Sequence, residues 1–111
     1  MTDRREHPAS LLLIVAAWAL WASAFVTMYA AQAVGCAMDV AISSHRAMML
    51  AIWILHLAAL FALVIYCRKR MAGTAFDPLQ FTCRIAFWSA LAATITTAWT
   101  GSMVSFVTPC V

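Results

Sequence analysis

Three long stretches without a charged residue limit what this chain can fold into. Residues 9–38, 47–67 and 85–111 contain no Asp, Glu, Lys or Arg. A helix needs about 20 apolar residues to cross the roughly 30 Å hydrocarbon core of a bilayer, and each stretch is long enough. Because lipid offers the backbone no hydrogen-bond partners, each stretch is expected to form a helix rather than an open strand.

The overall composition agrees with this interpretation. The chain has 111 residues, of which 66% are hydrophobic and 10% are charged, whereas soluble domains average about 45–50% apolar and 25% charged residues. The sequence therefore predicts an all-α membrane protein, a single membrane domain over residues 1–111. Its three transmembrane helices are expected at about 10–34, 45–67 and 78–107. The first stretch is longer than the roughly 7–15 residues of a signal-peptide core, so we expect a retained anchor.

Polar residues and prolines mark the expected helix ends, because short polar side chains cap helix N-termini and proline suits the first helical position. The expected markers are Ser10 before the first helix, Ser43 or Ser44 before the second, Asp77-Pro78 before the third and Thr108-Pro109 after it.

The basic residues predict an orientation. In a three-span arrangement Arg4, Arg5, Arg68, Lys69, Arg70 and Arg84 share one side of the membrane, and only Arg46 lies on the other. By the positive-inside rule the N-terminus is cytoplasmic and the C-terminus periplasmic. We therefore expect a multi-pass protein of the bacterial inner membrane, and no nucleic-acid partner.

Small residues recur at four-residue spacing in the first and third helices. Such residues let helices approach closely in lipid, where leucine side chains gain little by leaving the tails. The predicted packing residues are Ala19, Ser23 and Thr27 in the first helix and Ala93, Thr97 and Gly101 in the third. The threonine hydroxyls of the third helix, at Thr94, Thr96, Thr100 and Thr108, are expected to bond back to their own helix carbonyls.

The predicted topology sorts the four cysteines into two pairs. Cys36 and Cys110 follow the outer ends of the first and third helices, on the oxidising side where disulfides persist, and we predict a bridge between them. Cys67 and Cys83 face the reducing side and are expected to stay thiols. The alternative is a copper(I) site of Cys36, Met38 and His45, since soft sulfur ligands suit this ion.

Two histidines share one face of the second helix. His56 lies near the predicted midplane, where an ionisable side chain is costly and is first considered functional. His45 precedes it by eleven residues, close to three turns, and Met49 lies between them. These three residues are the candidate metal or haem ligands. The structural alternative is a neutral His56 that hydrogen-bonds a Ser or Thr on a neighbouring helix.

Several residues resemble a known family. Trp18, Tyr29 and Cys36, with Trp99-Thr100-Gly101 and the terminal Pro109-Cys110, resemble small uncharacterised three-span proteobacterial membrane proteins found near genes for cytochrome c oxidase and its assembly factors. The resemblance covers the first and third helices, about half of the chain. It implies an accessory or assembly role beside a respiratory oxidase. Many relatives carry a histidine where this chain has Ala22 and Ser23, so the resemblance implies no haem or metal role here.

These observations favour a non-catalytic accessory subunit or assembly factor of a membrane complex, with a respiratory haem-copper oxidase as the candidate complex. Its expected partners are lipid and other membrane subunits, or further copies of itself. No enzyme is expected, because the chain lacks a nucleophile–base pair and a phosphate loop. The favoured interpretation has no cofactor. One alternative is a redox or metal protein that binds haem b or copper through His45, Met49 and His56. A second is a small transporter, channel or holin.

Overall fold

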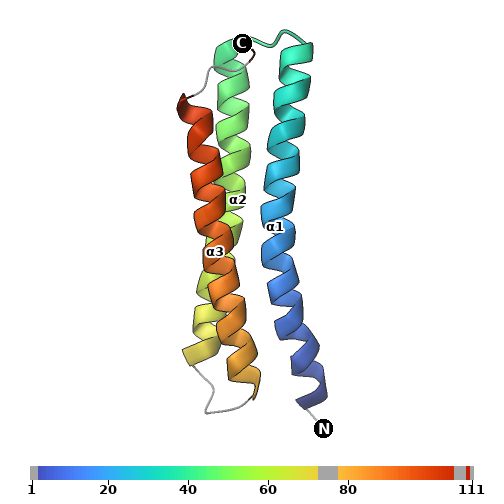
Figure 1. Ribbon diagram of the computed structural model, residues 1–111, viewed down its shortest axis with the longest axis vertical. Helices are drawn as coiled ribbons and strands as arrows, with labels where there is room; N and C mark the ends of the chain where they lie inside the picture. Colours follow the sequence, from blue (N-terminus) through green and yellow to red (C-terminus); the bar gives the residue numbers. More distant parts are fainter. Residues whose placement is uncertain (1–2, 73–77, 107–109, 111) are drawn as a thin grey trace.

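The chain folds into three long helices that lie side by side. The computed structural model describes residues 3–72, 78–106 and 110. They form α1 (Asp3–Ala37), α2 (Ile42–Ala72) and α3 (Pro78–Phe106). Successive helices run in opposite directions along a rod of 58 × 21 × 15 Å (Figure 1). Each helix contacts both of the others. The end of the rod that holds Cys36 and Cys110 is called the disulfide end below, and the opposite end the basic end.

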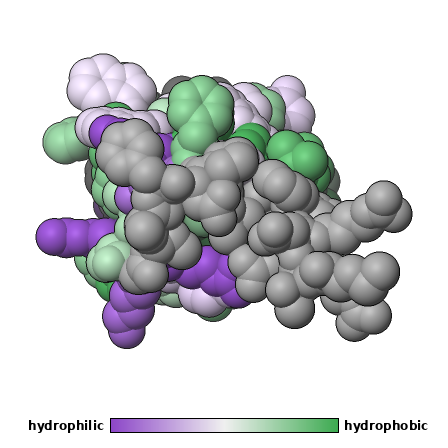
Figure 2. Space-filling model, turned by 90° about the horizontal axis from the view of Figure 1, so that it is seen from below, coloured by the Kyte–Doolittle hydropathy of each residue, from purple (hydrophilic) through white to green (hydrophobic). Residues whose placement is uncertain are grey.

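Two of the helices have the length and composition to cross a membrane. They are the segment Leu11–Ala37 of α1 and the whole of α2, Ile42–Ala72. Little of either segment is buried inside the bundle, and large apolar side chains such as Leu12, Leu55 and Phe106 are exposed. At the basic end, hydrophilic side chains project beside apolar ones (Figure 2). The predicted all-helical fold is confirmed.

The helices begin and end beyond most of the predicted positions. Ser10 lies inside α1, and Ser43 and Ser44 lie in the first turn of α2, so none of them precedes its helix. The first bond of α2 runs from the His45 amide to the Ala41 carbonyl, at 2.9 Å. α3 begins at Pro78 as predicted. Asp77, Thr108 and Pro109 lie outside the described residues.

A Schellman-type turn ends α1. Asp39 adopts a left-handed backbone conformation with φ of 52°, which Asp tolerates better than most residues. The Val40 amide then donates to the Gly35 carbonyl at 3.2 Å, the bond that closes this motif. At the other end of the bundle α2 continues through Lys69 and Arg70, because cations are favourable at the negative end of a helix dipole. The chain turns sharply after α1, which brings α2 back along it.

Small residues form much of the core. On α3 the buried face follows Ala86, Ala90, Ala93, Thr97 and Gly101, which includes all three residues predicted for this helix. Close packing of such residues is how helices associate in lipid.

The buried face of α1 differs from the predicted stripe. Ala19 and Thr27 are exposed and Ser23 is half-buried, whereas Ala17 and Ala24 are buried. The reason is geometric: with 3.6 residues per turn, a four-residue step rotates about 40° around the helix, whereas a seven-residue step nearly keeps its face. Ala19 and Thr27 therefore lie on the exposed side of α1.

Candidate functional site

The disulfide end of the bundle is closed by a covalent link. Cys36, in the last turn of α1, is bonded to Cys110, which follows α3. Their Cα atoms are 5.4 Å apart, within the usual range for a disulfide. Cys67 and Cys83 are free and buried. The bridge is the predicted one. It also means that Cys36 offers no thiolate to the alternative copper(I) site.

A short chain of polar contacts joins this disulfide to α2. The Gln32 side-chain amide donates to Cys36 Sγ at 3.7 Å. The Gln32 carbonyl oxygen lies 2.9 Å from His45 Nε2 and can only accept, so Nε2 carries the proton. Gln32 thus holds His45 in one orientation and links it to the covalent end of the bundle.

The opposite side of the His45 ring is packed against the backbone of α1. His45 is 1% exposed, and its Nδ1 is buried without a hydrogen-bond partner. A Cβ at Gly35 would overlap His45 Nδ1 and Cε1. Only glycine at this position lets the imidazole lie this close to α1. The ring therefore serves as a packed spacer between the two helices.

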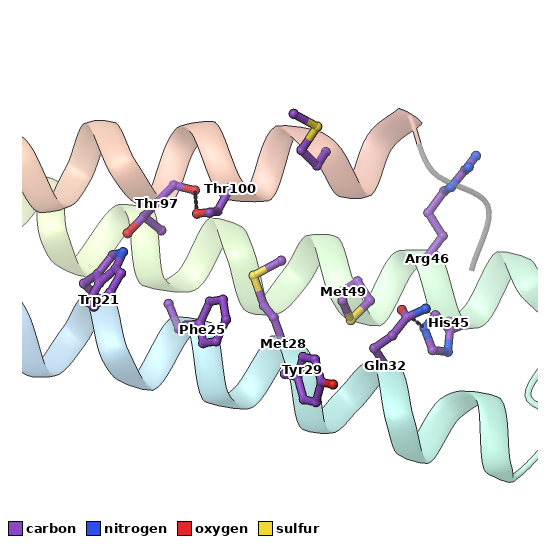
Figure 3. Close-up of a pocket in the computed structure, with 12 residues that line it drawn as sticks. Trp21, Phe25, Met28, Tyr29, Gln32, His45, Arg46, Met49, Thr97 and Thr100 are labelled. Atoms are coloured by element: carbon purple, nitrogen blue, oxygen red, sulfur yellow. Dashed lines mark hydrogen bonds between the residues drawn. The ribbon is translucent and has the colours of Figure 1, made fainter. Parts of the chain in front are cut away.

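A cleft of about 290 Å³ runs from His45 toward the middle of the bundle. Side chains of α1 and α3 form its walls, and α2 contributes His45, Arg46 and Met49 (Figure 3). The cleft has aromatic, thioether and threonine walls and a polar end beside Arg46. Its lining residues are Trp21, Ala24, Phe25, Met28, Tyr29, Gln32, His45, Arg46, Met49, Thr97, Thr100 and Met103.

The threonines of α3 present little polarity to this cleft. The Thr97 hydroxyl donates to the Ala93 carbonyl at 2.8 Å, and the Thr100 hydroxyl to the Thr96 carbonyl at 2.6 Å. Thr94 and Thr96 bond back to α3 in the same way. The expectation is therefore confirmed for Thr94, Thr96 and Thr100; Thr108 lies outside the described residues.

His56 lies away from the cleft and makes two hydrogen bonds. Its Nδ1 is 2.8 Å from the Ile52 carbonyl, which can only accept, so Nδ1 carries a proton. Its Nε2 lies 3.1 Å from Ser23 Oγ on α1. In the neutral imidazole Nε2 can accept from the Ser23 hydroxyl, whose single proton also reaches the Leu20 carbonyl at 3.1 Å and serves one of the two acceptors at a time. This is the arrangement of the structural alternative for His56.

The structure does not bring His45, Met49 and His56 together as one ligand set. His45 and Met49 both line the cleft, but His56 does not. The separation of eleven positions between the two histidines corresponds to about 16 Å along the helix. Among the described residues, no three His, Cys, Asp or Glu side chains converge as a metal site.

One residue of this end, Gln32, carries no signal in the small-residue or histidine patterns. Gln32 is the only carboxamide in the first charge-free stretch, and that isolation is the signal that could have found it. Gly35 and Gly101 are recognised as close contacts only once their neighbours are known, because His45 packs on the first and Trp53 on the second. The Trp53 indole also donates to the Thr97 carbonyl, at 3.0 Å.

Comparisons with protein-family models, curated proteins and solved structures found no match. The fold and site define the class: an all-helical protein with two helices able to cross a membrane and a disulfide joining α1 to the segment after α3.

Proposed function

We propose that this chain is a three-span protein of the bacterial inner membrane that acts as a non-catalytic accessory subunit or assembly factor of a larger membrane complex. Its N-terminus is cytoplasmic and its C-terminus periplasmic. The candidate complex is a respiratory haem-copper oxidase, which the resemblance of Trp99-Thr100-Gly101 and Pro109-Cys110 suggests.

The third span is supported by the length and position of α3. Its 29 residues correspond to about 43 Å, more than the hydrocarbon thickness. It lies beside α1 and α2 along most of the rod (Figure 1). The orientation is supported by the basic residues at the end of α2 and by the disulfide at the opposite end, since disulfides persist on the oxidising side.

The observation that carries the subunit role is a face of α2 that the described residues leave exposed. Ala51, Ala58 and Ala62 are exposed along α2, with exposed Leu55 between them. Small residues at such spacing favour close approach of another helix in lipid. No contact within the described residues covers this face, so it is available to a helix of another subunit.

The topology can be tested with reporter cysteines at exposed sites, because Cys67 and Cys83 are buried. A membrane-impermeant maleimide added to intact spheroplasts is expected to label a Ser43→Cys variant and to leave Lys69→Cys and Arg84→Cys unlabelled until the cells are lysed. Ser43, Lys69 and Arg84 are all exposed. Labelling of Lys69→Cys from outside would invert the proposed orientation.

The subunit role can be tested by mild-detergent purification followed by mass spectrometry. We expect a large membrane complex to copurify with the native chain. The yield of this complex should fall about tenfold in an Ala58→Leu/Ala62→Leu variant, because the larger side chains block the approach of the partner helix. Ala92→Leu, the same type of substitution at one exposed position of α3, should retain the complex. Recovery of a lone chain from native membranes contradicts the proposal. A haem band or bound copper that His56→Ala removes would favour a redox protein instead.

A further inference from the structure

We propose that the cleft beside His45 binds one anionic phospholipid, with an acyl chain along Phe25 and Met28 and the headgroup phosphate at Arg46. The inference depends on the proposed membrane insertion but not on the subunit role. It assigns a ligand to a cavity that the disulfide, the helix packing and the histidine bonds leave unfilled.

The walls of the cleft suit a hydrocarbon chain. Phe25 and Met28 on α1 line the cleft opposite Thr100 and Met103 on α3, and Figure 3 shows the Phe25, Met28 and Thr100 side chains in the region between α1 and α3. The Thr100 hydroxyl is directed to its own helix carbonyl, so it adds little polarity. The cleft is also open at the surface, since Phe25 and Met103 are exposed by 56% and 52%. A lipid can therefore enter from the side.

The length of the cleft matches one leaflet of a bilayer. Its lining extends along α1 from Trp21 to Gln32, eleven residues or about 16 Å. Half of a roughly 30 Å hydrocarbon core is about 15 Å. The polar end, with Arg46, lies toward the disulfide end of the bundle (Figure 3). An acyl chain that follows the cleft therefore reaches the midplane while its headgroup stays at the surface.

The polar end suits a phosphate. Arg46 is exposed and makes no ion pair within the described part of the chain, and it is the only Lys or Arg between Glu6 and Arg68. Guanidinium groups bind phosphate through paired, charge-assisted hydrogen bonds.

The contacts at this end favour a phospholipid over a quinone. A quinone needs donors aimed at its two carbonyl oxygens. The Nε2 proton of His45 is held by Gln32, and the Gln32 amide is directed to Cys36. The Arg46 guanidinium at this end is a cation, and its charge matches a phosphate.

The test is native mass spectrometry of the purified chain after equilibration with equal amounts of phosphatidylglycerol and phosphatidylcholine. We expect one retained phospholipid per chain, mainly phosphatidylglycerol. Arg46→Gln should lower phosphatidylglycerol retention about five- to tenfold, the range of a charge-assisted contact. Arg68→Gln makes the same change of charge at the basic end and should leave retention unchanged.

A second variant tests the cleft itself. Thr100→Trp fills it from the exposed side of α3 and should abolish retention of both lipids, whereas Ala92→Trp, on an exposed position outside the cleft, should not. Equal retention in Arg46→Gln and Arg68→Gln, full retention in Thr100→Trp, or a quinone as the extracted occupant would each overturn the inference. Because the maleimide and copurification results do not depend on these variants, failure here leaves the proposed function standing.

Discussion

Replacing Gly101 with alanine is expected to destabilise the bundle, although alanine is the better helix former. A Cβ at Gly101 would overlap the Trp53 indole at Nε1 and Cδ1. The indole must move, and it then loses its 3.0 Å hydrogen bond to the Thr97 carbonyl. Overpacking of this kind costs about 1–3 kcal/mol, and the lost bond about 0.5–1.5 kcal/mol. Helix propensity alone predicts the opposite sign, a gain of about 1 kcal/mol.

The measurement is the free energy of unfolding in mixed detergent micelles for a double-mutant cycle. Gly101→Ala and Trp53→Leu should each destabilise the protein, and the double variant should be more stable than the sum of the two changes predicts, because the overlap is removed. Ser102→Ala, one residue further along α3, should change stability little. A Gly101→Ala protein as stable as the native chain would show that α2 and α3 do not pack as closely as described.

The close contact at Gly101 shows how far the sequence could predict this fold. Ala93, Thr97 and Gly101 were predicted as a packing face, and α3 buries all three. On α1 the same four-residue rule selected Ala19 and Thr27, which are exposed. Residues at four-residue spacing rotate gradually around the helix axis. The positions of the neighbouring helices decide which of these residues face the interface.

The polar part of the site was harder to predict than the disulfide. Cys36 and Cys110 could be paired because a count of spans puts them at the same end of the bundle. The contact between Gln32 and His45, at 2.9 Å, depends on how α2 is rotated about its own axis. That rotation is set by the close packing of His45 against Gly35. Sequence periodicity does not predict such a contact between two particular side-chain shapes.

Loss of the Cys36–Cys110 bridge is expected to have the second large effect on stability. The two cysteines are 74 residues apart, and closing such a loop in a free chain gives about 4–5 kcal/mol in the chain-entropy model. In lipid or detergent the helices are already confined in the unfolded state, so the disulfide removes less conformational entropy there than in a free chain. We therefore expect Cys36→Ser to lower the free energy of unfolding by about 2 kcal/mol, at the low end of measured disulfide effects.

Comparing the stability losses of the single and double cysteine variants distinguishes loss of the disulfide from damage to local packing. Cys36→Ser, Cys110→Ser and the double variant should all lose the same amount, since either change opens the same loop. A reducing agent should bring the native protein to that level and leave the variants unchanged. Cys67→Ala and Cys83→Ala remove the free thiols and should keep the response to reduction. If instead the two serine variants differ and their effects add, the cysteines contribute through separate contacts. The bridge would then not be what holds α3 to the end of α1.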